Sequence, residues 1–443
     1  MRIRDLENKN IGIWGLGVEG KAVLKTLNEI YPNKKIIVID DKKLSSEEIL
    51  SELTKLDVVI RSPGVSIYKP EIIEAKKNGL IVLTEKTLFF NEINNTSGLD
   101  EDERPKIIAI SGTKGKTTTS IFCAYLLQKM GYKVLLAGNM GISTIELLDE
   151  AKQSDFVVVE LSSYQNSDLM ANIDVAIILN LFPEHIDWHK THENYYNDKL
   201  NLIKNANYRI INGSDERILS HIDKNEAVIK FGTVDTINYH DGFFYDGNKK
   251  LLSSQNMELL GEHNYQNLCS ILTAMKVLGL DFSKIEQDYF DKFKPVEHRL
   301  ETITHNVDNK KVLFVNDSIS TIPEAAIACY KIFKEKNIYG ILGGFDRNQD
   351  YEELINYIVN NKNIKFLTLL GQTGKRLYES FMSKNFKNVK MCNDLAECVN
   401  VLKKQIIHDD LVSSVVLLSP ASPSYDMFKN FEERGKLFKE LIK

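Results

Sequence analysis

The sequence predicts a soluble α/β protein of three domains built on largely parallel sheets. The chain has 443 residues, about three times the usual size of one domain. Continuous Val, Ile and Leu runs, typical of strands buried on both faces, alternate with helical stretches. Apolar residues make up 43% and charged residues 26% of the chain, which is enough apolar surface for several cores and excludes a mainly disordered protein.

The expected strands occur along the whole chain, with helices between them. Two helices are indicated by apolar periodicity, over residues 117–130 and 266–278. The expected strands span residues 10–14, 35–40, 58–61, 106–111, 156–161, 175–180, 209–212, 312–316, 339–343, 366–371 and 415–419.

Two segments are expected to separate the domains. Residues 91–106 are polar and acidic and contain Gly98 and Pro105, as linkers do. Near residues 294–301 a helical stretch ends and a strand-rich segment begins. The predicted domains are therefore 1–93, 94–296 and 297–443.

Charge and cysteine content exclude several classes of protein. Lys and Arg total 56 and Asp and Glu total 61, and this net charge of −5 argues against general nucleic-acid binding. The five cysteines are scattered, with no CxxC pair that would indicate a disulfide framework or a zinc site. The N-terminus lacks the apolar core of a signal peptide, and no apolar run is long enough to span a membrane. We expect a cytoplasmic protein without a membrane or nucleic-acid partner.

A glycine-rich turn near the N-terminus predicts a nucleotide site. Gly15, Gly17 and Gly20 follow the first expected strand and open a helix, and Asp40 ends the second strand. Glycines at this spacing let the backbone approach a diphosphate, and an acidic residue after the second strand can hold ribose. A second tight turn, with Ser62 and Gly64, follows the third strand. The pattern alone leaves open NAD, another phosphorylated nucleoside, or a turn that is only structural.

A second glycine-rich loop predicts ATP or GTP binding. It directly follows strand 106–111 and begins a helix with a lysine and a hydroxyl, which suit terminal phosphates and Mg²⁺. It is shorter than a strict Walker A loop, because Ile110 stands where the first glycine belongs. The alternative is a glycine-rich turn with an exposed lysine. The loop residues are Gly112, Thr113, Lys114, Gly115, Lys116, Thr117 and Thr118.

A carboxylate and three histidines follow the loop. Glu160 ends a strand, where a carboxylate can hold Mg²⁺. His185, His189 and His192 lie within eight residues and allow a zinc site, but the phosphate loop favours Mg²⁺ or Mn²⁺ with one histidine ligand. We expect His189 and His192 to be exposed at a helix start. Lys199, taken alone, is typical of an exposed helix lysine.

Taken together and in order, the motifs resemble the Mur ligase family, ATP-dependent amide-bond ligases that extend the peptidoglycan precursor. The resemblance covers nearly the whole chain and is specific as a set. It rests on the segments 112–118, 160–165 (ELSSYQ), 180–187, 261–267 (GEHNYQN), 297–299 (EHR), 316–318 (NDS) and 418–435.

The resemblance implies a role for each matching residue. The N-terminal and C-terminal domains would be Rossmann-like and the central domain P-loop ATPase-like. The UDP end of the substrate would be held by Gly15, Gly17, Gly20, Asp40, Ser62, Gly64 and Asn139. ATP would contact the 112–118 loop, Asn267, Arg299 and Asp317. Metal ligands at two Mg²⁺ sites would be Thr117, Glu160, His185 and Lys199, the last as a carbamate. The residues with catalytic roles would be Lys116, His185 and Lys199. The incoming amino acid would meet Thr321, Arg347, Ser424 and Phe431.

The implied reaction is an ADP-forming ligation in peptidoglycan precursor synthesis, carried out by a monomer. The carboxylate of UDP-N-acetylmuramoyl-L-alanine would attack the γ-phosphorus of ATP, and the amine of D-glutamate would then displace phosphate from the acyl phosphate. Two departures weaken the match at the glutamate pocket: Ile319 and Arg347 occupy regions where lysines are common. In the phosphate loop, Lys114 stands where asparagine is common. L-glutamate is therefore an alternative substrate.

Proteins of other classes account for less of the chain. A NAD-linked oxidoreductase would explain the first glycine turn and nothing in the central domain. A P-loop switch or motor would explain the second loop but neither the first turn nor the C-terminal segment. A binding module would not need Lys116, Glu160 and His185 together.

Overall fold

The computed structural model describes residues 1–95, 103–138, 142–223, 225–294 and 297–443, and the predicted α/β class is confirmed in them. The chain forms two compact units. The first contains Met1–Asn256 and Asn264–Asp291, and the second Met257–His263 and Lys292–Lys443. The division into the three predicted domains stays a prediction.

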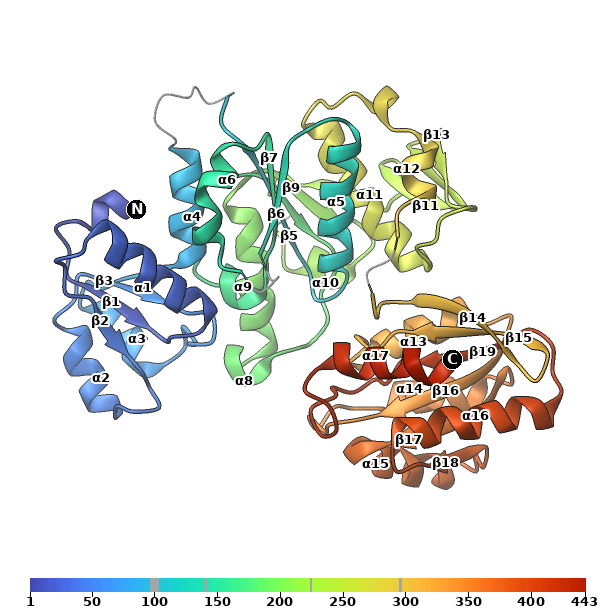
Figure 1. Ribbon diagram of the computed structural model, residues 1–443. Coiled ribbons are helices and arrows are strands. Elements are labelled where there is room, and N and C mark those ends of the chain that lie inside the picture. The colour runs from blue at the N-terminus through green and yellow to red at the C-terminus, as the bar shows by residue number, and fades with distance from the viewer. Residues whose placement is uncertain (96–102, 139–141, 224, 295–296) are drawn as a thin grey trace. The chain divides into compact units, whose positions relative to one another are not determined.

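The N-terminal part of the first unit is a parallel four-stranded sheet of order β2-β1-β3-β4 (Figure 1). The apolar faces of η1 and α1 cover one side of this sheet, and α2 and α3 cover the other. Its strands are β1 Ile11–Trp14, β2 Ile37–Ile39, β3 Val58–Arg61 and β4 Ile81–Thr84. Its helices are η1 Ile3–Leu6, α1 Val18–Ile30, α2 Ser46–Leu53, α3 Pro70–Lys77 and α4 Glu85–Asn94.

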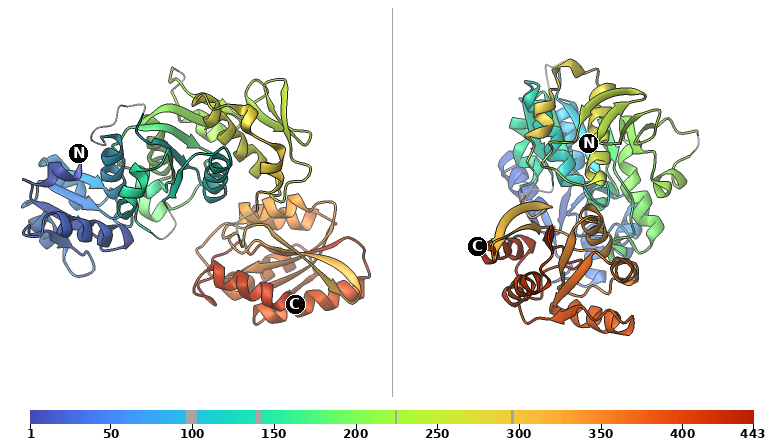
Figure 2. Two further views of the ribbon diagram at one scale, coloured as in Figure 1. Left: turned by 45° about the horizontal axis from the view of Figure 1, so that its top comes forward. Right: turned by 90° about the vertical axis from the view of Figure 1, so that its right-hand side faces the viewer.

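A parallel six-stranded sheet of order β10-β9-β8-β5-β7-β6 follows in the same unit (Figure 2). Helices α4, α6 and α9 pack apolar side chains on one face of it. Its strands are β5 Lys106–Ser111, β6 Val134–Ala137, β7 Phe156–Glu160, β8 Ile173–Ile178, β9 Ala206–Asn212 and β10 Ile229–Phe231. The helices along this stretch are α5 Lys116–Lys129, η2 Thr144–Leu147, α6 Leu148–Lys152, α7 Ser163–Asn166, α8 Ile186–His189, α9 His192–Lys204 and α10 Glu216–Ser220.

A small antiparallel sheet of order β11-β12-β13 completes the first unit. Phe290 joins it to the larger sheet, because its ring contacts Phe244 of β12 and Phe122 of α5. The elements are β11 Ile237–His240, β12 Phe243–Asp246, β13 Lys249–Ser253, α11 Glu262–Val277, η3 Phe282–Lys284 and α12 Gln287–Asp291.

The second unit is a six-stranded sheet of order β14-β15-β19-β16-β17-β18, in which only the β14–β15 pair is antiparallel. Helices α13, α14 and α15 cover one face, and α16 and α17 the other. The strands are β14 Glu301–Val307, β15 Lys310–Asn316, β16 Asn337–Gly343, β17 Ile364–Leu370, β18 Val389–Met391 and β19 Ser414–Leu418. The helices are α13 Pro323–Ile332, α14 Glu352–Asn360, α15 Gly371–Ser383, α16 Leu395–Asp409 and α17 Phe431–Ile442.

The expected strands are present with bounds shifted by a few residues, but others were not predicted. The missed strands are short or polar: β4, β6, β10, β11, β12, β13, β14 and β18. Helix α4 runs to Asn94, into the segment expected to be a linker. Within the described part of the chain, no helix has the length and apolar character of a membrane span.

Candidate active site

The phosphate loop lies between β5 and α5, as expected, and is fixed by side chains of a neighbouring strand end. Gly115 has φ +85° and precedes the first turn of α5. Asn180 clamps Lys114 from both sides: its Oδ1 accepts the Lys114 N–H at 2.8 Å, and its Nδ2 donates to the Lys114 carbonyl at 2.9 Å. Thr113 Oγ1 lies 2.7 Å from the Tyr195 hydroxyl. These contacts fix the conformation of the loop.

Two lysine ammonium groups converge on one carbonyl of the loop. Lys116 Nζ donates to the Gly112 oxygen at 3.0 Å, and Lys199 Nζ donates to the same oxygen at 2.9 Å. Lys199 is 2% exposed, so the expectation of an exposed helix lysine is wrong. Burial and the neighbouring Lys116 hold the pKa of Lys199 well below its usual range. Burial and the neighbouring cation therefore favour the neutral amine of Lys199.

The predicted metal ligands Glu160 and His185 stand at the ends of their elements. Glu160 is the last residue of β7 and is buried. His185 precedes α8 in a left-handed conformation, and burial lowers its pKa to about 4, with further lowering by Lys199. A neutral imidazole at physiological pH keeps the lone pair that a metal requires. Beside it, Glu184 pairs with Lys114 at 2.9 Å.

The other two histidines of this segment lie in opposite environments. His192 is exposed at the start of α9, as expected. His189 is fully buried, so the expectation of exposure is wrong. Both of its ring nitrogens are engaged, Nε2 with Ser163 Oγ at 2.9 Å and Nδ1 with Asp198 Oδ2 at 2.6 Å. Because no nitrogen of His189 is left for a metal, the three histidines do not form a zinc site.

The described residues contain no group of three or more His, Cys, Asp and Glu side chains placed to hold a metal. A divalent ion here would need oxygen ligands of other kinds, such as a threonine hydroxyl and phosphate oxygens, which suits Mg²⁺. Thr117 lies in the first turn of α5, and the neighbouring Thr118 Oγ1 is buried with no hydrogen-bond partner among the described residues. The donor set therefore fits an Mg²⁺–phosphate ligand.

Asn267, a further residue predicted to contact ATP, lies against the phosphate loop. A β-carbon on Gly115 would collide with the amide of Asn267 in α11, so that side chain lies directly against the phosphate loop. Arg299 and Asp317 belong to the second unit, and their approach to the loop stays a prediction.

The first glycine turn lies between β1 and α1, as expected, and its role as a nucleotide site stays a prediction. Gly15 has φ +88°, its carbonyl accepts the Ser62 hydroxyl, and Gly17 precedes α1. Gly64 and Asp40 lie at the same carboxyl edge of the sheet, after β3 and β2. Leu16 and Val18 are 40% and 58% exposed, and this exposed apolar pair was not singled out from the sequence. Asn139 lies outside the described residues.

Replacing Gly20 with alanine will destabilise this turn. The β-carbon would collide with the Gly15 carbonyl and approach Ser62 Oγ, so we expect the free energy of unfolding to fall by about 2 kcal/mol. Gly17→Ala is the matched control, because a β-carbon there meets nothing within 4 Å. Denaturant unfolding of both variants measures the difference, and equal stability of the two would contradict the packing argument.

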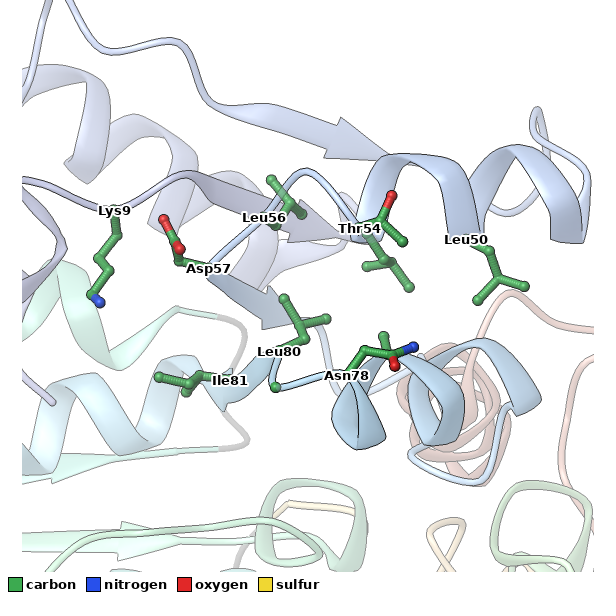
Figure 3. Close-up of a pocket in the computed structure, with 11 residues that line it drawn as sticks. Lys9, Leu50, Thr54, Leu56, Asp57, Asn78, Leu80 and Ile81 are labelled. Atoms are coloured by element: carbon green, nitrogen blue, oxygen red, sulfur yellow. The ribbon is translucent and has the colours of Figure 1, made fainter.

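A cavity lies beside this sheet, away from the glycine turn. It measures about 280 Å³ and lies at the opposite edge, where β1, β3 and β4 begin (Figure 3). Its lining includes Lys9, Asp57 and aliphatic side chains such as Leu80. None of the predicted site residues lines this cavity.

In the second unit, Asp317 is a buried carboxylate at the end of β15. Its oxygens accept the Ser320 hydroxyl, the Ser419 hydroxyl at 2.9 Å and the Leu300 N–H at 3.2 Å. Burial raises the pKa of Asp317 to about 6, although the two hydroxyls and Arg299 act in the opposite direction. The ionised form is therefore held at a cost to stability.

Replacing Asp317 with asparagine will stabilise the protein at neutral pH. The amide keeps the acceptor for Leu300, and its N–H₂ can donate to the two serine hydroxyls. Because the pKa is raised on folding, the cost is absent below the unfolded value and is nearly complete at pH 7, above the folded value of about 6. The advantage of the variant should grow by about 2 kcal/mol between pH 4 and pH 7, because a small part of the cost is already present at pH 4. Unfolding of wild type and variant at both pH values measures it. The exposed Glu335→Gln serves as control, and an advantage of Asp317→Asn that does not grow with pH would contradict the argument.

The four predicted amino-acid contacts lie on loops at the carboxyl edge of the C-terminal sheet. The Thr321 carbonyl accepts from Gln349 at 3.1 Å, which ties Thr321 to the loop that carries Arg347. That loop is joined to the Ser424 loop, because Phe345 N–H donates to the Pro423 carbonyl at 2.8 Å. Phe431, the first residue of α17, accepts the Ser318 hydroxyl at 2.8 Å through its carbonyl.

Arg434 was missed by the sequence analysis and holds these loops together. It is 1% exposed and donates to Ser318 Oγ at 3.0 Å, the Ser318 carbonyl at 2.8 Å and the Ser422 carbonyl at 3.1 Å. Burial lowers its pKa to about 10, against the opposing charge of Asp426, and its hydrogen bonds go to neutral oxygens of Ser318 and Ser422. Its position in the FEERG segment, one helical turn after Phe431, was the available signal.

Comparison with known proteins gives consistent matches over the whole chain. Residues 110–275 match the Mur ligase middle domain. A UDP-N-acetylmuramoyl-L-alanine--L-glutamate ligase of Xanthomonas euvesicatoria pv. vesicatoria is 30% identical over 100% of this chain and 96% of its own length. A UDP-N-acetylmuramoylalanine--D-glutamate ligase of Fusobacterium nucleatum is 33% identical over 98% and 99%. The MurF ligase of Thermotoga maritima, solved in complex with ADP, shares the fold with a TM-score of 0.60 at 14% identity, over 90% of this chain and 92% of that chain.

Proposed function

This chain belongs to the Mur ligase family, and from that premise we propose that it joins glutamate to UDP-N-acetylmuramoyl-L-alanine at the expense of ATP, in peptidoglycan precursor synthesis. The observation that carries the proposal is the convergence of Lys116 and Lys199 on the Gly112 carbonyl of the phosphate loop. Such a site suits a terminal phosphoryl group, because Lys116 would supply the fixed cation that the developing charge needs, and Lys199 lies where a carbamate could help to hold a metal.

The chemistry follows from the need to activate a carboxylate. Attack of the substrate carboxylate on the γ-phosphorus of ATP forms an acyl phosphate and ADP. The glutamate amine then attacks the acyl carbon, and phosphate leaves with the electrons of the broken C–O bond. The loop backbone and Lys116 would hold the phosphates, and Asn267 would contact the nucleotide base. The Gly15–Gly20 turn would hold the UDP diphosphate at the start of α1.

Mg²⁺ is proposed at the carboxyl edge of the central sheet. The Thr117 hydroxyl, the Glu160 carboxylate and the neutral His185 imidazole would be its protein ligands, with Lys199 contributing once it carries a carbamate. A bound Mg²⁺ would neutralise charge on the phosphate oxygens. Two sites are proposed, and Mn²⁺ would suit the same donors.

The isomer of glutamate has two candidates. D-glutamate is the sequence-based prediction, and L-glutamate is favoured by a specific observation: Arg347 and Ile319 replace lysines expected for a D-glutamate pocket. Arg347 stacks on Tyr425, 5.6 Å from guanidinium to ring centroid, on the loop pair that carries Ser424. A guanidinium fork binds a carboxylate in a different geometry from an ammonium.

Phosphate release in the presence of ATP, Mg²⁺ and UDP-N-acetylmuramoyl-L-alanine tests the proposal. Turnover should require the acceptor and one glutamate isomer, and D- and L-glutamate are compared side by side. ATP hydrolysis without any acceptor would contradict a ligase. NADH titration should show no binding, and binding would instead favour an oxidoreductase.

A further inference from the structure

A buried hydrogen-bonded chain runs beside the phosphate loop. Ser163 Oγ contacts His189 Nε2 at 2.9 Å, and His189 Nδ1 contacts Asp198 Oδ2 at 2.6 Å. The order of groups is that of a hydrolase triad. Ser163, His189 and Asp198 are only 2%, 0% and 5% exposed, however, so no substrate can reach the serine. The chain therefore suits a positioning role rather than a nucleophilic one.

Three members of this hydrogen-bonded chain lie within four residues, in sequence, of a residue of the proposed phosphoryl-transfer site. Ser163 begins α7, three residues after Glu160, and Asp198 directly precedes Lys199 in α9. His189 ends α8, the helix that His185 precedes. The hydrogen-bonded chain thus links the segments that carry Glu160, His185 and Lys199, which are three of the four proposed metal ligands.

A residue of the loop that follows β3 extends this hydrogen-bonded chain. The Tyr68 hydroxyl donates to Asp198 Oδ1 at 3.0 Å, from the loop that follows β3. The same loop binds Trp188 on two sides: Ser66 Oγ donates to the Trp188 carbonyl at 2.7 Å, and Trp188 Nε1 donates to the Pro63 carbonyl at 3.0 Å. Trp188 directly precedes His189. The loop therefore meets the hydrogen-bonded chain at Asp198 and next to His189.

The loop over residues 62–69 also contains Ser62 and Gly64, which the proposed function assigns to the UDP substrate. We propose that Tyr68, Asp198, His189 and Ser163 act as positioning residues that couple occupancy of this loop to the alignment of Lys199 and Glu160. The inference rests on the proposed function. Substrate held by the 62–69 loop fixes Tyr68, which fixes Asp198 and, through His189, the start of α7.

The test uses Tyr68→Phe, which removes only the hydroxyl, with Tyr31→Phe as matched control, because Tyr31 donates to the Ile3 carbonyl at 2.9 Å elsewhere in the unit. We expect Tyr68→Phe to lower kcat about tenfold while the Kd for the UDP substrate stays near wild type, and the melting temperature to fall modestly because the buried Asp198 loses a donor. The control should keep wild-type kcat. An unchanged kcat in Tyr68→Phe, or a loss confined to substrate Kd, would overturn the inference.

A double-mutant cycle separates a coupled chain from independent packing defects. Ser163→Ala removes the far end of the chain, and Ser163→Ala with Tyr68→Phe should lower kcat little more than the more severe single variant. Effects that multiply would overturn the inference, since independent defects are additive in free energy. Inactive wild-type enzyme would contradict the proposed function and the inference with it. Active wild type with multiplying effects contradicts the inference alone.

Discussion

Replacing Lys116 with alanine will lower kcat by about 10²–10³-fold, because the variant lacks a preorganised cation at the proposed γ-phosphate position. Lys116 contacts the Gly112 and Thr113 carbonyls of the phosphate loop, at 3.0 and 3.1 Å. The proposed UDP site is built on a different sheet, so the affinity for UDP-N-acetylmuramoyl-L-alanine should be unchanged. Phosphate release and calorimetric titration measure the two quantities separately.

Lys129→Ala is the matched control, since Lys129 is an exposed lysine in the last turn of the same helix. It should keep wild-type turnover. Loss of UDP-substrate binding in Lys116→Ala would place the two sites together and contradict the separate assignment of the glycine turn and the phosphate loop.

Lys199→Ala should reduce turnover by a factor comparable to that of Lys116→Ala. The reason is different, because this variant would lose the anionic carbamate proposed for Lys199. Its lowered pKa favours the neutral amine, the form that can attack CO₂ and release a proton to give a carbamate. Wild-type activity should fall when CO₂ is removed and return with bicarbonate, while the variant should not respond. A carbamate carbon signal after treatment with ¹³C-bicarbonate would mark the group directly.

Lys86 provides the matched control because it is another buried lysine with the opposite electrostatics. It is 1% exposed and pairs with Glu85 and Glu19, at 2.6 and 3.0 Å. Burial lowers the pKa of Lys86, but the two carboxylates outweigh burial and raise this pKa above its usual value. Lys86 therefore stays charged and should not take up CO₂. A ¹³C signal that survives in Lys199→Ala, or substantial bicarbonate-dependent activity of that variant, would contradict the carbamate.

Asp317 and Arg434 show how the second unit maintains charge in its interior. Asp317 is held ionised at neutral pH against burial, and Arg434 donates to neutral oxygens of Ser318 and Ser422 at the carboxyl edge of the same sheet. Burial disfavours the charged form of both side chains. If Asp317 contacts the nucleotide as proposed, Asp317→Asn is expected to stabilise the protein and to lower its activity.

The sequence by itself determined the features that are local. The glycine turn at Gly15–Gly20 and the phosphate loop at 112–118 are contiguous strand–loop–helix segments, and their positive-φ glycines are encoded where they act. The alternation of apolar runs and helices likewise determined the α/β class. Short strands such as β4 were missed because four residues give little periodicity to distinguish a strand from a helix, and polar ones such as β14 because they lack a continuous apolar run.

Only the tertiary structure decided the environment of single side chains. His189 and Lys199 lie in a polar stretch that is typical of an exposed helix surface, yet packing of α8 and α9 against α7, β5, β8 and the 62–69 loop buries both. Whether a helix residue faces water or a loop some 90 residues earlier in the chain depends on contacts that no local pattern encodes. Burial and neighbouring charge then set the pKa of Lys199, and with it the chemistry proposed for the site.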